Sequence, residues 1–394
     1  MIPMSHRVLK TGCGLGSWCR RWIAIGIVAA WAWTADATEA DAAAPAATPP
    51  PTDAAAAAPA PRKFPPPSNR LYQVRVPEFT RETYATTVEA LVRAFEQRSG
   101  RELALGGRGR VGLKVYSDSG AGLGTPRDLT RGLLDALERR GIARGQVLIV
   151  GLNEAHLREA GYLPPLSVGG DRFEGAKVIA LDSGDYWEPD WFYDSPLPGA
   201  DDSPLEQPLS SFEETKRAFE RESQRRSFLP IPLMFDVDFW INLPVCSDHP
   251  VVGVNAALVN ITLWNASNTQ RFFRSPASAP AAVAEMAAIP ELREGLVFHL
   301  VSLERYQFIG GPIFNSLYTI SEPLVWLSDN PVMIDSLLRD RIDRGRESTG
   351  FRGLPEDLRL IPYAEQMGLG SGNPAKIEWV DVTPAPAVAE VTAR

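Results

Sequence analysis

Apolar positions alternate along the chain between short continuous runs, which are typical of buried strands, and stripes at helical spacing. The runs predict strands at 72–76, 112–116, 147–150, 177–181, 235–243, 296–303, 324–327 and 377–382. The stripes predict helices at 80–100, 125–141, 154–160, 363–367, from Phe212 onward and from Pro331 onward. This repeated alternation predicts an α/β fold with a mainly parallel or mixed sheet and helices on both faces.

The clearest strand-to-helix transition runs from Val111 to Gly141. Three glycines follow its apolar run, namely Gly120, Gly122 and Gly124. Glycines allow positive φ angles and close approach of a ligand to the backbone. We expect Thr125 to cap the following helix and Pro126 to be its first residue.

A glycine turn that leads into a helix presents unpaired N–H groups, and the helix dipole adds a partial positive charge there. Lys114 precedes the turn and is expected to add a full charge. The spacing matches neither GxGxxG nor GxxxxGK. Two interpretations therefore stay open: an anion-binding site formed by Lys114, the three glycines and Thr125, or a tight turn without a ligand.

The segment from Asp182 to Asp194 interleaves carboxylates with five aromatic residues. We expect a long loop that its aromatic side chains fold over the domain. Exposed aromatics beside carboxylates would alternatively stack on a sugar ring or hold a cation.

Another polar group follows the predicted strand at 235–243, where Cys246 precedes Asp248 and His249. An imidazole at a strand end is a candidate general base or metal ligand, with Asp248 or Asp236 nearby. The alternative is an ordinary turn in which both residues are structural. Metal-dependent hydrolysis that uses Asp236, Asp248 and His249 is the least favoured interpretation. Cys246 is expected to be inert, and His299, inside an apolar strand, to be a core residue.

The net charge and the cysteine count argue against some classes of function. The chain has 394 residues, 44% of them hydrophobic, and a net charge of −8. Removing 1–37 takes away four basic residues and one acidic residue, which leaves 36 against 47, or −11. This charge argues against a nucleic-acid partner. Beyond the leader only Cys246 remains, so neither an intrachain disulfide nor an iron–sulfur cluster is expected.

The N-terminal region has the layout of a secretory signal peptide. Arg20 and Arg21 precede an apolar run that is too short to span a bilayer, and Ala35-Asp36-Ala37 offers a cleavage site. We expect a signal peptide at 1–37, a disordered Ala/Pro-rich linker at 38–68, one α/β domain at 69–383 and a disordered tail at 384–394. The protein is then exported to the periplasm or beyond the bacterial cell, and contacts a membrane only if the leader stays uncleaved.

Several motifs in one order resemble the domain of unknown function 362 family, in the form found on exported bacterial proteins. The resemblance covers roughly 111–382 and rests on VGLKV with GAGLGTP, DVDFWINLPVCSDH with GVNAALVNITL, GGPIFN, LSDNPVMID and AEQMGLGSGNPAKIEWVDV. It implies an α/β fold, export and no settled activity. The family pattern places asparagine at Tyr116 and lysine at both Ser247 and Val259, so two positive charges are missing from a shared polar region. Other positions of that region are kept, namely Lys114, Asp248, His249, Asn255, Asn260 and Asp335.

These observations favour an exported protein that binds an anionic small molecule at the glycine turn, with weak or lost catalysis. Lys114, the glycine turn, Asn255 and Asn260 are the expected binding residues. Asp248 and His249 are the expected catalytic pair, and no metal or identified cofactor is expected. The alternative is a non-catalytic module of the cell envelope that binds saccharide or a protein partner through its aromatic loop.

Overall fold

The computed structural model describes residues 66–195 and 225–384. The predicted signal peptide, the surface helix predicted from Phe212 onward and nearly all of the predicted linker and tail lie outside these residues. Within the described part of the chain, no helix is long and apolar enough to cross a membrane.

A nine-stranded sheet forms the centre of the domain, in the order β15-β1-β14-β11-β8-β2-β3-β5-β4. Its strands are β1 (Arg70–Arg75), β2 (Val111–Val115), β3 (Val147–Gly151), β4 (Arg172–Phe173), β5 (Ala176–Ala180), β8 (Phe239–Leu243), β11 (Leu296–Ser302), β14 (Leu324–Ser328) and β15 (Glu378–Asp381). The five neighbours from β11 to β5 are parallel. β14 runs antiparallel to both β11 and β1. The predicted mixed, mainly parallel sheet is therefore confirmed.

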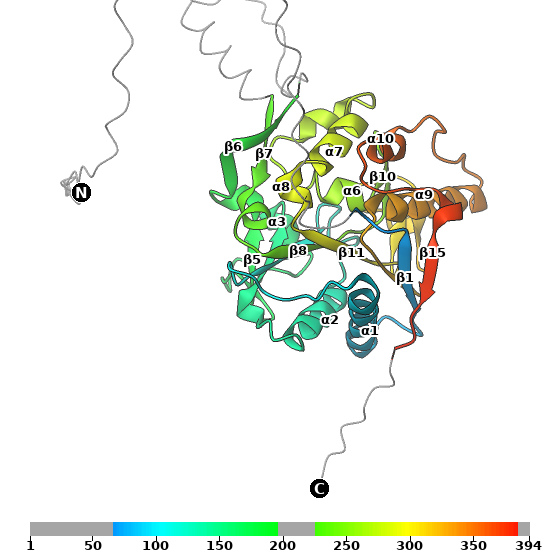
Figure 1. Ribbon diagram of the computed structural model, residues 1–394. Helices are drawn as coiled ribbons and strands as arrows, with labels where there is room; N and C mark the ends of the chain where they lie inside the picture. Colours follow the sequence, from blue (N-terminus) through cyan, green and yellow to red (C-terminus); the bar gives the residue numbers. More distant parts are fainter. Residues whose placement is uncertain (1–65, 196–224, 385–394) are drawn as a thin grey trace, which may run out of the picture. The chain divides into compact units, whose positions relative to one another are not determined.

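Helices cover both faces of this sheet, as predicted (Figure 1). One face carries α1 (Arg81–Ser99) and α2 (Arg127–Glu138). The other carries α6 (Ala257–Asn260), α7 (Ala279–Ala287), α9 (Pro331–Ser348) and α10 (Leu360–Gln366). Shorter helices are α3 (Glu154–Glu159), α5 (Ile231–Met234) and α8 (Pro290–Arg293).

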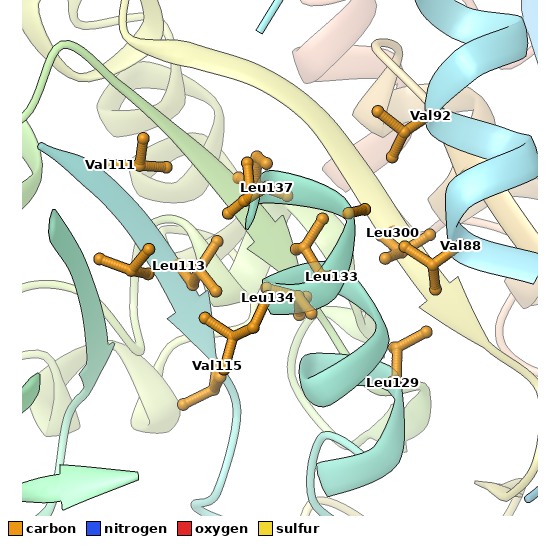
Figure 2. Packing of buried hydrophobic residues seen from close by; sticks show 14 of the residues in the cluster. Val88, Val92, Val111, Leu113, Val115, Leu129, Leu133, Leu134, Leu137 and Leu300 are labelled. Atoms are coloured by element: carbon orange, nitrogen blue, oxygen red, sulfur yellow. The ribbon is translucent and has the colours of Figure 1, made fainter. Parts of the chain in front are cut away.

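Alternation along β2 assigns its side chains to the two faces. Val111, Leu113 and Val115 join the core beneath α1 and α2, where Leu133 and Leu137 of α2 pack against them (Figure 2). The residues between them point to the opposite face, because successive side chains of a strand alternate. That opposite face is covered by α6 and α7, whose apolar side chains join a second core cluster.

Helix ends follow the sequence signals in α1 but not in α2. Thr80 caps α1 by accepting the N–H of Thr83, and Gly100 closes the helix with a φ of 68°. In α2 the cap position is Pro126 and not Thr125. The Thr125 hydroxyl accepts the Tyr116 N–H at 2.9 Å and donates to the Leu243 carbonyl at 2.6 Å. It joins two strands instead of capping a helix.

Two segments for which no strand is predicted do form strands. The aromatic segment forms β6 (Trp187–Asp194), which pairs with β7 (Arg226–Pro230). The segment at 247–255 forms β9 (Ser247–His249) and β10 (Gly253–Asn255), in one four-stranded sheet with β12 (Tyr306–Gln307) and β13 (Thr319–Ile320). β9 and β10 have only three residues each, and β6 pairs with a strand that is distant in sequence, so the local pattern did not indicate them.

Contact between α1 and α2 requires a glycine. A Cβ at Gly132 would lie 2.8 Å from the Tyr84 carbonyl oxygen of α1. We expect Gly132→Ala to lower the free energy of unfolding by about 1–2 kcal/mol, because overpacking outweighs the gain in helix propensity. Chemical denaturation measures this change. The matched control is Gly145→Ala, where no atom lies within 4 Å and the change should stay within about 0.5 kcal/mol. Equal stability of the two variants would contradict the prediction.

Candidate functional site

The chain leaves two neighbouring parallel strands toward opposite faces of the sheet. After β2 it forms α2 on one face, and after β8 it forms α6 and α7 on the other. Such a topological switch point leaves a crevice beyond the carboxyl ends of the strands, where ligands of open α/β sheets bind. A cavity of about 260 Å³ lies there. Its walls are the glycine turn, the start of α2, the end of α3 and the segments after β8 and β11.

The glycine turn forms a wall of this cavity, and its glycines are explained by packing. A Cβ at Gly122 would lie 2.0 Å from the Phe314 ring, and one at Gly124 would lie 3.2 Å from the Tyr116 carbonyl oxygen. Gly120 has a φ of 91°, which favours glycine. Gly122, Gly124 and Thr125 line the cavity, whereas Gly120 does not.

Lys114 lies beneath the second face of the sheet and does not line the cavity, which corrects the expectation that its ammonium group reaches the turn. Its side chain is fully buried, and Nζ donates to the Val115 carbonyl at 2.9 Å and to Asn260 Oδ1 at 3.3 Å. Burial lowers the Lys114 pKa to about 8, although Asp118 opposes this shift. The predicted proximity of Lys114 and Asn260 is thus observed, away from the cavity.

A row of buried polar side chains extends from Lys114 across neighbouring strands. Lys114 is in register with Asn242 of β8, which is in register with His299 of β11. Asn260 Nδ2 donates to Asn242 Oδ1 at 2.7 Å, and Asn242 Nδ2 lies 2.8 Å from His299 Nδ1. Burial lowers the His299 pKa to about 3, so the imidazole is neutral. His299 is a core residue, as expected.

Asp248 and His249, the predicted catalytic pair, lie on β9 and also do not line the cavity. The Asp248 carboxylate accepts the N–H groups of Gly310 and Gly311 and lies 3.4 Å from Arg346. His249 Nδ1 accepts the backbone N–H groups of the two residues at 251 and 252. Burial lowers the His249 pKa to about 4. Both side chains therefore hold loops in place in this structure.

The remaining polar positions of the family pattern also have structural partners. Asn255 accepts the Trp264 indole N–H at 2.7 Å and donates to Ser247 at 3.2 Å. Asp335 of α9 accepts the first two N–H groups of α6 at 2.7 and 3.1 Å, and burial raises its pKa to about 7. None of these side chains reaches the cavity.

The other side chains considered from the sequence do not form a second candidate site in the described part of the chain. Cys246 is buried, and burial raises the pKa of its thiol well above the usual value, so the thiolate is disfavoured. Among residues 66–195 and 225–384, no group of three His, Cys, Asp or Glu side chains is placed to hold a metal ion. In β6 the aromatic side chains pack on neighbours, with Trp191 edge-on to Phe235 and Tyr193 donating to Glu285.

The side chains that do line the cavity include two arginines that the sequence analysis missed. Arg127 begins α2 and lies against Gly161, where a Cβ would be 2.8 Å from a guanidinium nitrogen. Arg305 follows β11 and donates to the Gly122 carbonyl at 2.8 Å. Neither forms an ion pair with a carboxylate in the described part of the chain. The sequence did offer a signal for them, because Arg127 follows the glycine turn and Arg305 follows a strand.

A carboxyl group lies beside these arginines. Glu304 Oε2 accepts the Tyr84 hydroxyl at 2.9 Å, and the Tyr84 oxygen lies 2.6 Å from Ser302 Oγ. Burial raises the Glu304 pKa, while the Tyr84 hydrogen bond and the charge of Arg305 oppose the shift. The cavity therefore combines two guanidinium groups with a carboxyl group that protonates more readily than usual. The exposed carboxylate of Glu159 lies at its rim.

No family model and no curated protein matches the chain. Among solved structures, the fold is similar to a crystal structure of a Thermotoga maritima protein determined by the Northeast Structural Genomics Consortium, with 9% sequence identity and a TM-score of 0.36. The match covers 73% of this chain, and the chain spans 59% of that protein. A similarity this low carries no functional argument, and the resemblance to the domain of unknown function 362 family stays a prediction.

Burial of Lys114 predicts a pH dependence of stability. Between pH 8 and 10.5 the unfolded chain binds a proton that the folded chain has lost. The free energy of unfolding should therefore rise with pH in this window, by up to about 1.4 kcal/mol per pH unit from this group. Lys114→Met should remove that rise.

Urea denaturation at several pH values measures this effect. Lys376→Met is the control, because Lys376 is exposed and its loss should leave the slope unchanged. A slope that survives in Lys114→Met would show that Lys114 titrates as an ordinary lysine.

Proposed function

We propose that the chain binds an anionic small molecule in the cavity between the carboxyl ends of β2 and β8. The observation that carries this proposal is the pair Arg127 and Arg305, which line the cavity without a carboxylate partner among the described residues. Guanidinium groups bind carboxylate and phosphate oxygens through paired hydrogen bonds. The binding residues are then these arginines and the turn from Gly122 to Thr125, in place of the Lys114 set expected from sequence.

The N-terminus of α2 also favours a negatively charged ligand. This helix has 12 residues, its first turn has no side-chain cap, and Pro126 and Arg127 line the cavity. Uncapped N–H groups and the helix dipole favour a negative charge at this end. Two carboxylates also line the cavity: Glu159 is exposed to solvent, which screens its charge, and Glu304 is held by the Tyr84 hydroxyl.

We further propose that catalysis at Asp248 and His249 is weak or lost. Their hydrogen bonds to backbone N–H groups occupy the atoms that a general base would use. Turnover of any substrate that depended on His249 would contradict this proposal.

Binding is tested by isothermal titration with inorganic phosphate and with sulfate. The variant Arg127→Ala/Arg305→Ala should lose at least about tenfold in affinity, because each charged hydrogen bond contributes roughly 1.5–3 kcal/mol. Arg110→Ala is the matched control, since Arg110 is an exposed arginine at the opposite end of β2. If neither anion binds the intact protein, or if the double variant binds as tightly as the control, the proposal fails.

We also propose that the protein is exported, because its first residues have the layout of a signal peptide. The full chain produced in a bacterium should be recovered outside the cytoplasm with a new N-terminus after Ala37. Mass spectrometry of the periplasmic and secreted fractions identifies that terminus. An intact N-terminus in the cytoplasmic fraction alone would rule out export in that host.

A further inference from the structure

A second hollow adjoins the cavity. It has a volume of about 430 Å³ and is lined by Phe79, Thr319, Ile320 and Ser321 together with Glu304 and Arg305. Glu304 and Arg305 also line the first cavity. The two hollows therefore share a wall, and together they exceed the size needed for a simple inorganic anion.

The two hollows differ in chemistry. The second contributes one aromatic and one aliphatic side chain, both half-buried, and two neutral hydroxyl groups. Its charged lining groups, among the described residues, are the two that it shares with the first cavity. The Phe79 ring is held 5.9 Å from the Tyr84 ring of α1. Such a lining suits a neutral ring, because apolar walls with a few polar groups are typical of sites for organic ligands.

The shared wall is held in a defined position from both sides. Tyr84 fixes Glu304 through Oε2 at 2.9 Å, while Glu304 Oε1 has no hydrogen-bond partner in the described part of the chain. The Gly122 carbonyl holds the Arg305 guanidinium at 2.8 Å, and the Phe314 ring lies 5.8 Å from it. A ligand that spans both hollows would meet the Arg305 guanidinium and a Glu304 oxygen that accepts no hydrogen bond from the described residues.

We propose that the ligand is an organic anion in two parts, with its anionic group between Arg127 and Arg305 and a neutral ring against Phe79 in the second hollow. Glu304 Oε1 then accepts a hydroxyl or amine hydrogen of the ligand at the junction. This inference rests on the proposed anion site and specifies the class of molecule that the site selects. An inorganic anion would bind only in the first cavity and would not contact Phe79 or Ile320 in the second hollow.

The test compares inorganic phosphate with phenyl phosphate by isothermal titration of the full chain. Phenyl phosphate should bind at least about tenfold more tightly, because its ring is removed from water against Phe79. Phe79→Ala should abolish this advantage and leave phosphate affinity unchanged. Ile320→Ser tests the opposite wall in case Phe79→Ala does not fold. Trp379→Ala is the control, since Trp379 is a half-exposed aromatic on the edge strand β15 and does not line either hollow.

The possible failures are distinguishable. If phosphate binds through the two arginines but phenyl phosphate binds no better, the two-part ligand is overturned and the anion site stands. An advantage that persists in both Phe79→Ala and Ile320→Ser places the ring elsewhere and also overturns the inference. If neither compound binds, the anion site fails, and the two-part ligand fails with it.

Discussion

Parallel pairing of β2 with β8 determines where the cavity forms. The two strands are parallel and in register from Val111 opposite Phe239 to Val115 opposite Leu243. The right-handed crossovers that follow β2 and β8 run to opposite faces of the sheet. Neither crossover therefore covers the space beyond the carboxyl ends of these two strands. Thr125 strengthens this edge by joining both strands through its hydroxyl. The cavity is therefore a consequence of strand order, whatever residues line it.

The same pairing places polar residues side by side in the interior. Lys114 and Asn242 are opposite each other under α6, where no solvent reaches them. A buried polar group is tolerated when its hydrogen bonds are made within the protein, and Asn260 of α6 supplies the bridging amide. The buried row consequently specifies how α6 sits on the sheet. The expectation that Lys114 faces a ligand did not take these internal hydrogen bonds into account.

Sequence reasoning succeeded where local signals decide the structure. The continuous apolar runs gave the parallel strands, and Thr80 and Gly100 marked both ends of α1. It failed where long-range contacts decide, as in the pairing of β9 with β12, which are separated by more than fifty residues. The direction of the Lys114 side chain belongs to this second class. So does the meeting of Tyr84, Ser302 and Glu304, because they come from a helix and a strand end that are distant in sequence.

The motifs that resemble the domain of unknown function 362 family act on the cavity from a distance. Asp248 holds the backbone N–H groups of Gly310 and Gly311, which begin the loop that carries Phe314. A few residues later, the Phe314 N–H donates to the Ser119 carbonyl at 2.9 Å, and its ring occupies the space left by Gly122. Gly122 in turn accepts Arg305 through its carbonyl. A continuous set of contacts thus links Asp248 to the position of Arg305 at the cavity.

Through these contacts, Asp248 of β9 helps to position residues that line the cavity. This role does not require Asp248 to take part in a reaction. Asp248 accepts backbone N–H groups, and such bonds stabilise a loop whether or not a substrate is nearby. The cavity, by contrast, takes its charge from Arg127 and Arg305, which lie outside the polar positions that the family pattern preserves. Ser247 and Val259, where the pattern of the family that the chain resembles has lysine, lie in the buried layer around α6 and β9 and do not line the cavity. A change at either position would therefore alter the interior of the fold and leave the two guanidinium groups at the switch point in place.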